Sequence, residues 1–222
     1  MLSPARRHLM RQEAVEASQQ ASNPLRHASG YELMLLKLNE DKRRLKKVRS
    51  KERKAELKRD MLPEYLPWVA GVLSQGKGAQ DAVLMTVMIW RLDAGDVPGA
   101  LEIARYAIVH GLVPPAGFKR DATAYLLAEE VADATTRAWT LKAPVDTGPL
   151  LATIELTKSA DMPDQVRAKL HKITGYVLRD GGRALDAMEH LTRALQLHEG
   201  CGVKKDIERL ATELKKQAIA RR

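Results

Sequence analysis

Residues 31–60 contain neither proline nor glycine, and leucine, lysine, arginine, glutamate and alanine fill most of the positions. Ser29 can cap the start of a helix there, and Glu32 follows three residues later, as in a capping box. This stretch therefore predicts one long basic helix from Gly30 to Asp60, with about 30 residues and a length of about 45 Å.

The apolar stripe of this predicted helix is thin, because charged residues fill its last two-thirds. A long helix with so little apolar surface is poorly stabilised alone. Two interpretations remain open: the helix packs against a second copy of the chain, or it is solvated and frays beyond Val48. The stripe follows a rough heptad, which consists of Tyr31, Met34, Leu38, Leu45, Val48 and Ala55.

The remainder of the chain is divided by glycine and proline into apolar segments with helical spacing. No segment alternates polar and apolar residues as a strand would. Aromatic residues make up only 4% of the chain, which favours packed helices over sheets. We therefore predict an all-α fold class, with helices after residue 60 at 66–73, 81–92, 97–110, 121–141, 150–159, 162–179, 184–198 and 203–220.

An internal repeat supports this fold class. The segment Asp93–Ile108 aligns without gaps with Asp180–Leu195, at an offset of 87 residues. Small residues recur on the second helix of each segment, where a neighbouring helix must approach closely. The pattern favours antiparallel helix pairs that form a scaffold, and a tetratricopeptide-like peptide groove is the alternative. The scaffold is preferred because true arrays of that kind repeat at about 34 residues.

These patterns predict three parts. Residues 1–29 are expected to form a flexible arm, because Asn23-Pro24 breaks any helix there, and a short helix over 6–19 is the alternative. Residues 30–78 are expected to form a basic helical region, whose excess of lysine and arginine and thin apolar stripe are typical of DNA binding and oligomerisation. Residues 79–222 form a helical-hairpin, tetratricopeptide-like body with a charged last helix.

The charge distribution separates a basic front end from a nearly neutral body. The chain has a formal net charge of +9, and residues 1–60 hold 16 lysines and arginines against 8 aspartates and glutamates. Of the 18 residues from Lys42 to Arg59, 11 are cationic and two are acidic, an imbalance that costs stability unless an anion neutralises it. The pattern predicts contact with nucleic acid, and a solvated helix is the alternative.

Duplex phosphates are the expected contact of this basic segment. No aromatic residue lies between Tyr31 and Tyr65, so base stacking has no side chains there. The predicted DNA-binding residues are Lys42, Arg43, Arg44, Lys46, Lys47, Arg49, Lys51, Arg53, Lys54, Lys58 and Arg59.

The sequence offers no convincing catalytic or metal-binding constellation. Cys201 is the single cysteine. Asp41, Glu52 and Lys54 match a nuclease-like spacing, but they lie where charged residues are so frequent that such matches arise by chance. Because a glycine-rich phosphate-binding loop is also absent, we expect no catalytic residue, no metal and no cofactor. No apolar run is long enough to cross a membrane and Met1–Gln20 lacks a secretion signal, which predicts a cytoplasmic chain.

Several motifs are specific enough to compare with known families, and the run Gly76–Asp93 is the most specific of them. In these motifs the chain resembles the terminase small subunit of peduovirus-type tailed phages with cohesive ends. Besides that run they include Pro24-Leu-Arg-His27, Leu66-Pro-Trp68-Val, Asp161-Met-Pro-Asp164, Leu178-Arg-Asp-Gly-Gly182 and Gly202-Val-Lys-Lys-Asp-Ile-Glu-Arg209.

The resemblance implies partners that composition does not show. Small terminase subunits recognise the packaging site on concatemeric phage DNA, form homo-oligomeric rings, and recruit the large terminase ATPase in the host cytoplasm. The family's small subunit is commonly labelled the endonuclease subunit, yet no catalytic motif can be placed on residues here, so cutting is expected to depend on the large partner. The alternative is a helical-repeat interaction protein whose basic arm binds RNA. A third class, a self-contained endonuclease, would need carboxylates that converge on a cation, and the sequence does not reveal such a set.

Overall fold

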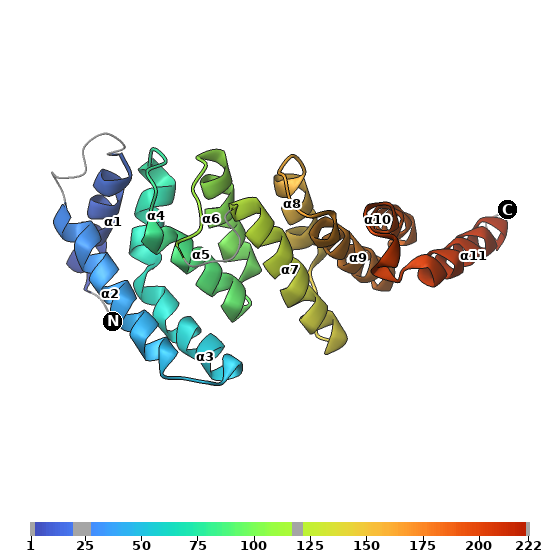
Figure 1. Ribbon diagram of the computed structural model, residues 1–222, viewed down its shortest axis with the longest axis horizontal. Helices are drawn as coiled ribbons and strands as arrows, with labels where there is room; N and C mark the ends of the chain where they lie inside the picture. The colour runs from blue at the N-terminus through green and yellow to red at the C-terminus, as the bar shows by residue number, and fades with distance from the viewer. Residues whose placement is uncertain (1–2, 20–27, 117–121, 221–222) are drawn as a thin grey trace. The chain divides into compact units, whose positions relative to one another are not determined.

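A computed structural model describes residues 3–19, 28–116 and 122–220 (Figure 1). The described residues form helices and turns without any strand, which confirms the all-α fold class. The chain divides into two compact units, Met1–Thr123 and Ala124–Arg222. The α-helices are α1 Pro4–Gln19, α2 Ala28–Lys46, α3 Lys51–Met61, α4 Leu66–Gln75, α5 Ala82–Ala94, α6 Val97–Val109, α7 Thr123–Thr140, α8 Thr147–Thr157, α9 Asp164–Asp180, α10 Ala184–Leu197 and α11 Lys204–Ala220.

The helices after residue 60 begin and end within a few residues of their predicted positions, because local capping chemistry fixes their ends. Asp81 caps α5, and its Oδ1 accepts the backbone N–H groups of Val83 and Leu84 at 2.8 and 2.9 Å. Gly95 ends α5 in the left-handed region, with φ at 86°. Asp96 then caps α6.

Helix α1 agrees with the alternative of a short helix over 6–19 and corrects the flexible arm over these residues. Residues 4–19 form a helix that packs on α4, and its Ala14 and Val15 are buried. Gly71 of α4 makes this contact possible, because any side chain there would collide with the backbone oxygen of Arg11. The contact depends on two segments far apart in sequence, which local patterns cannot reveal. The predicted break at Asn23-Pro24 lies outside the described residues.

The single long helix predicted from Gly30 to Asp60 is wrong, because the chain turns at residues 47–50. Ser50 is extended, with φ −64° and ψ 128°, and its Oγ accepts the Arg53 backbone N–H at 3.2 Å. This cap starts α3, which folds back and packs against α5, so that Met61 becomes buried. The free energy gained by burying α3 against α5 therefore outweighs that of continuing one solvated helix whose cations repel one another.

The apolar stripe of α2 is covered within its own unit, which neither interpretation of the long helix anticipated. Met34, Leu38 and Leu45 are 5%, 1% and 7% exposed. The ring of Tyr31 stacks on Trp68 at a centroid distance of 5.8 Å, and its hydroxyl oxygen accepts the Ala82 backbone N–H at 3.0 Å. A second copy of the chain is therefore not needed to cover this stripe.

The internal repeat corresponds to two helix pairs, α5–α6 in the first unit and α9–α10 in the second. Gly95 and Gly182, which align at the offset of 87, both lie in the left-handed region, with φ at 86° and 77°. The aligned alanines and leucine on the second helices are fully buried: Ala100, Ala104, Ala107, Ala187, Leu191 and Ala194. Close-packed helix pairs are thus confirmed, while the tetratricopeptide-like likeness stays a prediction.

Ala194→Leu is expected to lower the free energy of unfolding of the second unit by about 1–3 kcal/mol, because the larger side chain overpacks the α9–α10 contact. Urea unfolding of the full chain, followed by circular dichroism, measures this loss. Gln196→Leu adds a similar side chain to an exposed position on the same helix and should change stability by less than about 0.5 kcal/mol. Equal losses in the two variants would place the close contact elsewhere.

The α9–α10 pair also holds two facing histidines. The Nδ1 atoms of His171 and His190 lie 3.0 Å apart. Burial, followed by the charges of His190, Arg193 and Arg167, lowers the pKa of His171 to about 4. Burial likewise lowers the pKa of His190. Both rings are therefore neutral at pH 7, with one Nδ1–H donating to the other Nδ1.

Acidification should therefore destabilise the second unit. As the pH falls from 6.5 to about 4, the unfolded chain protonates His171 while the folded pair resists the proton, so the free energy of unfolding decreases. The expected loss is about 1–2 kcal/mol. His171→Gln should remove most of this slope in thermal melts taken across the pH range. His198→Gln, outside the pair, should keep it, and identical slopes in the two variants would contradict the argument.

Candidate nucleic-acid interface

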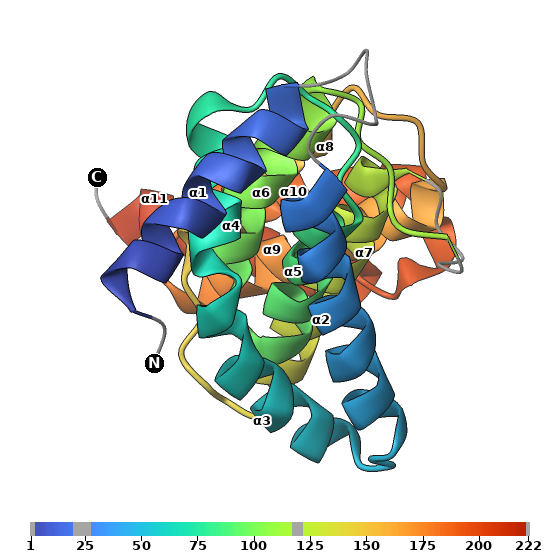
Figure 2. The same cartoon turned by 90° about the vertical axis from the view of Figure 1, so that its left-hand side faces the viewer.

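Helices α2 and α3 form a hairpin (Figure 2). All eleven cations that were predicted from the sequence to bind DNA lie on this hairpin. The turn at residues 47–50 reverses the chain, so cations near the end of α2 lie beside cations of α3. Their surroundings divide them into three sets: the cleft set is Lys42, Arg43, Lys46, Lys54 and Lys58, the tip set is Lys47, Arg49 and Lys51, and the outer set is Arg44, Arg53 and Arg59.

The cleft set lines a cleft of about 600 Å³ between α2, α3 and α5. Three of its cations come from α2 and two from α3, so the cleft exists only because the chain folds back at the turn. The other residues that line it are Asn39, Leu45, Thr86 and Trp90. The cleft is thus a concave surface with cationic side chains on two helices and a wall from the core helix α5.

Most of the positive charge in the cleft is uncompensated. Lys58 forms an ion pair with Asp93, whereas Lys42, Arg43, Lys46 and Lys54 form no ion pair with a described carboxylate. Burial, and then the charge of Lys46, lowers the pKa of the Lys42 ammonium. Four cations held together in this way repel one another, and a bound anion would relieve the repulsion.

The outer set differs from the cleft set, because each of its members has a partner within the hairpin or its neighbours. Arg44 pairs with Asp41 at 3.2 Å, and Arg53 pairs with Glu56 at 2.6 Å. The Nε–H of Arg59 donates to the backbone oxygen of Ala94 at 3.1 Å. Arg44 and Arg53 thus pair within their own helices, and Arg59 joins α3 to the end of α5. The structure does not bring these three arginines into the cleft.

Asp41 ties the hairpin to the core of the first unit. Its carboxylate is 3% exposed and accepts hydrogen bonds from Lys37 at 2.9 Å, Arg44 at 3.2 Å and the Tyr65 hydroxyl at 2.7 Å. Burial alone would raise the pKa of Asp41, but the bonds from Lys37 and Tyr65 outweigh it and hold the pKa below its ordinary range. Burial and the bond to Asp41 raise the pKa of Tyr65.

This geometry gives Asp41 a structural role instead of the nuclease-like role that its spacing formally allows. Its oxygens are taken by Lys37, Arg44 and Tyr65, and Glu52 lies exposed in the first turn of α3. Within the described ranges, no group of three or more histidine, cysteine, aspartate or glutamate residues could hold a metal ion. None of the described helices is long and apolar enough to span a bilayer.

Asn39, Thr86 and Trp90 line the cleft but were not predicted from the sequence. Thr86 and Trp90 belong to an almost entirely apolar helix, a pattern that predicts core residues. Trp90 is only 5% exposed. Its ring meets Tyr65 edge-on at 5.8 Å, so the wall of the cleft is joined to the Asp41 contacts. The single hydroxyl in the apolar run of α5, on Thr86, is the only sequence signal that could have suggested a polar surface there.

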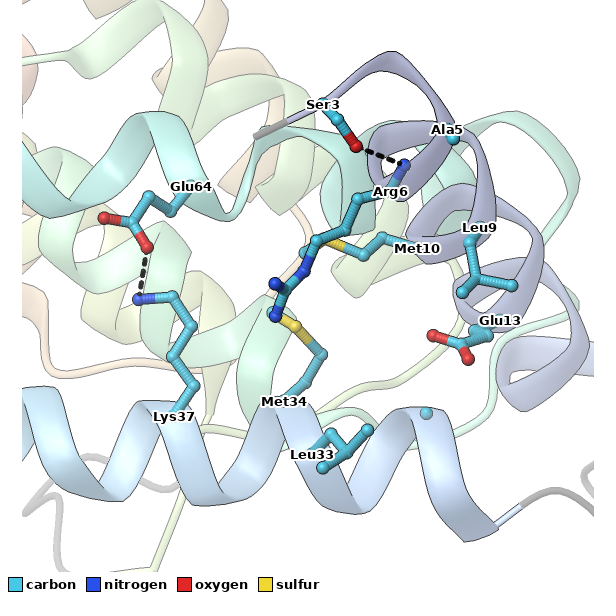
Figure 3. A pocket seen from close by; sticks show the side chains of 11 residues that line it. Ser3, Ala5, Arg6, Leu9, Met10, Glu13, Leu33, Met34, Lys37 and Glu64 are labelled. Carbon is cyan, nitrogen blue, oxygen red and sulfur yellow. Dashed lines mark hydrogen bonds and ion pairs between the residues drawn. The ribbon is translucent and has the colours of Figure 1, made fainter. Parts of the chain in front are cut away.

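A second surface of the first unit is the leucine groove, which lies between α1 and α2 and has a volume of about 650 Å³ (Figure 3). Met10 and Met34 line it together with Leu9 and Leu33, which are 57% and 64% exposed. At one end Lys37 pairs with Glu64 at 2.9 Å (Figure 3). Leu36, one turn further along α2, is 66% exposed. Leu33 and Leu36 of α2 are therefore exposed leucines in and next to a groove that also contains the charged side chains of Arg6 and Glu13.

Comparison with known proteins places the chain in a family. The family model described as phage small terminase subunit matches residues 35–165, a range that contains the whole cleft set. The match covers more than half of the chain, and the protein belongs to this family. The terminase endonuclease subunit of Escherichia phage P2 is 59% identical to it over 215 residues, which are 97% of this chain and 87% of the relative. No solved structure matches the chain.

Proposed function

We propose that this chain is the DNA-binding subunit of a phage packaging terminase and that it recognises duplex DNA at the packaging site. The observation that carries the proposal is the convergence of Lys42, Arg43, Lys46 and Lys54 on one cleft without described carboxylate partners. Binding of a polyanion would neutralise these four cations, and the phosphates of a DNA duplex supply regularly spaced negative charge. Membership of the small terminase family provides the biological context.

Recruitment of the large terminase ATPase in the cytoplasm of the infected cell is the second part of the proposal. The P2 relative is named as an endonuclease subunit. We assign cutting to the large partner, because Asp41, the acidic residue nearest to a nuclease-like arrangement, is held by Lys37, Arg44 and Tyr65. Incubation of the isolated subunit with cognate DNA and Mg²⁺ tests this assignment, and nicking under those conditions would contradict it.

The third part of the proposal is that copies of the chain assemble into a ring through the leucine groove. The resemblance to ring-forming small terminases motivates self-association. The heptad stripe first considered for it is buried in its own unit, whereas Leu9, Leu33 and Leu36 remain more than half exposed. Neighbouring exposed leucines are unfavourable in water and are typical of an interaction surface.

Equilibrium binding tests the proposed function against its alternative, an RNA-binding arm on a helical scaffold. Duplex DNA of packaging-site sequence and a structured RNA of equal charge are titrated with the full chain over a salt series. We expect tighter binding to the duplex, with an affinity that falls steeply as salt rises. Tighter binding to the RNA would favour the alternative, and no binding to either would overturn both.

A further inference from the structure

We propose that the cleft between α2, α3 and α5 holds backbone phosphates of one DNA strand, while the tip set stays outside this phosphate site. The inference rests on the proposed DNA-binding function and adds which surface of the hairpin makes the anchoring contact. It also names the chemistry that is recognised, a phosphodiester and not a base edge. Nothing in the charge pattern of the sequence distinguishes the cleft set from the tip set.

The geometry of the cleft favours a strand backbone. A volume of about 600 Å³ admits a short length of sugar-phosphate chain, whereas a whole duplex, whose major groove alone is about 12 Å wide, cannot enter. Ammonium and guanidinium groups reach the cleft from both sides, with Lys42 and Lys46 on α2 and Lys54 on α3. A strand between them would contact cations on two helices at once.

The electrostatics of the cleft point to the same ligand. Lys42 is half-buried beside Lys46 and pairs with no described carboxylate, and burial, followed by the charge of Lys46, lowers the pKa of Lys42. A phosphate between the two would compensate their charges. Arg43 and Lys46 are also exposed, but they line the cleft beside the half-buried Lys42 and Lys54. The tip set is exposed outside the cleft, where water solvates its charges. Binding there would gain less, because exposed ion pairs stabilise only weakly.

The groups beside the cations fit a phosphate and a sugar better than a base. Trp90 is almost fully buried, so it offers no flat face on which a base could stack. The Thr86 hydroxyl is buried and donates its hydrogen to the Ala82 backbone oxygen at 2.7 Å, so the contacts to an anion in this cleft come from the cations. Sequence-independent anchoring is therefore the expected role of this cleft.

Two quadruple variants with the same charge change separate the cleft from the tip. The first replaces Lys42, Arg43, Lys46 and Lys54 by alanine. The matched control replaces the three cations of the tip set, Lys47, Arg49 and Lys51, together with Arg53 of the outer set, which also lies outside the cleft. Each neutralised phosphate adds about 0.9 to the log–log salt slope. The cleft variant should therefore lose up to about 3.6 units of slope per engaged copy, and the control less than about 1. Circular dichroism checks that both variants keep their helices.

The outcomes separate this inference from the proposed function. A loss in the control that equals or exceeds the loss in the cleft variant would overturn the cleft as the phosphate site and leave DNA binding in place. Unchanged slopes in both variants would remove the hairpin from the interface altogether. A wild-type chain that does not bind duplex DNA would overturn the proposed function itself.

Lysine acetylation of the wild-type chain gives a second readout that does not depend on the folding of a variant. Bound duplex should protect Lys42 and Lys54 from acetylation more than Lys47 and Lys51, as measured by mass spectrometry. In a parallel sample, inorganic pyrophosphate replaces the duplex at equal phosphate concentration. It should protect the same lysines less, because it spans fewer of the cations. Protection of the tip lysines alone, or equal protection by pyrophosphate and duplex, would overturn the inference of a bound strand.

Discussion

Asp81→Ala is expected to lower the free energy of unfolding of the first unit by about 2–4 kcal/mol. Asp81 is 4% exposed and accepts three hydrogen bonds, two from the start of α5 and one from the indole N–H of Trp68 at 2.8 Å. Loss of the helix cap costs about 1 kcal/mol. The buried indole N–H of Trp68 is then left without an acceptor, which costs about a further 1–3 kcal/mol.

Asp146→Ala is the matched control for this prediction. Asp146 also caps a helix, α8, and accepts the Gly148 backbone N–H at 2.9 Å, but it is exposed and bonds no buried indole. Its loss should cost only about 1 kcal/mol. Trp68→Phe removes the shared bond from the other side, so combining it with Asp81→Ala should cost less than the sum of the two. An Asp81 variant no less stable than the Asp146 variant would contradict the argument.

Leu33→Asp is expected to convert an assembled wild-type protein into monomers. Leu33 is 64% exposed within its own unit, so the substitution should leave the stability of the monomer nearly unchanged. In an assembly through the leucine groove the same position is buried, where loss of one leucine costs about 1.5–3 kcal/mol per contact and an unpaired carboxylate costs more. Sedimentation velocity at micromolar concentration measures the shift.

Leu185→Asp provides the control for this second prediction. Leu185 is 73% exposed on α10 in the other unit, and its replacement should leave the assembly intact. An unchanged oligomer in the Leu33 variant would move the interface away from the leucine groove. A wild-type chain that sediments as a monomer would remove self-association from the proposed function.

Most helices could be predicted from the sequence because their ends are set by local chemistry. Asp81, Gly95 and Gly182 act through their own side chains or backbone angles, and their positions are visible in the sequence. The turn at residues 47–50 carries neither proline nor glycine, and only Ser50 marks it. It forms because α3 gains burial against α5, which is a tertiary effect.

The same distinction applies to the candidate site. The excess of lysine and arginine between residues 42 and 59 predicted where positive charge gathers. It could not show which cations are neutralised, because partners such as Asp93, which pairs with Lys58, lie far away in sequence. The contribution of α5 to the cleft and the packing of α1 on Gly71 likewise depend on folding of the whole unit.

Footprinting of the purified full chain on phage DNA that spans the cohesive-end region tests the central claim most directly. The claim is that this small terminase subunit recognises the packaging site by itself, with the hairpin cations as its anchor. It predicts one protected region at that site at protein concentrations that leave flanking DNA open to cleavage. Uniform protection along the fragment, or none at concentrations that saturate duplex binding, would contradict it.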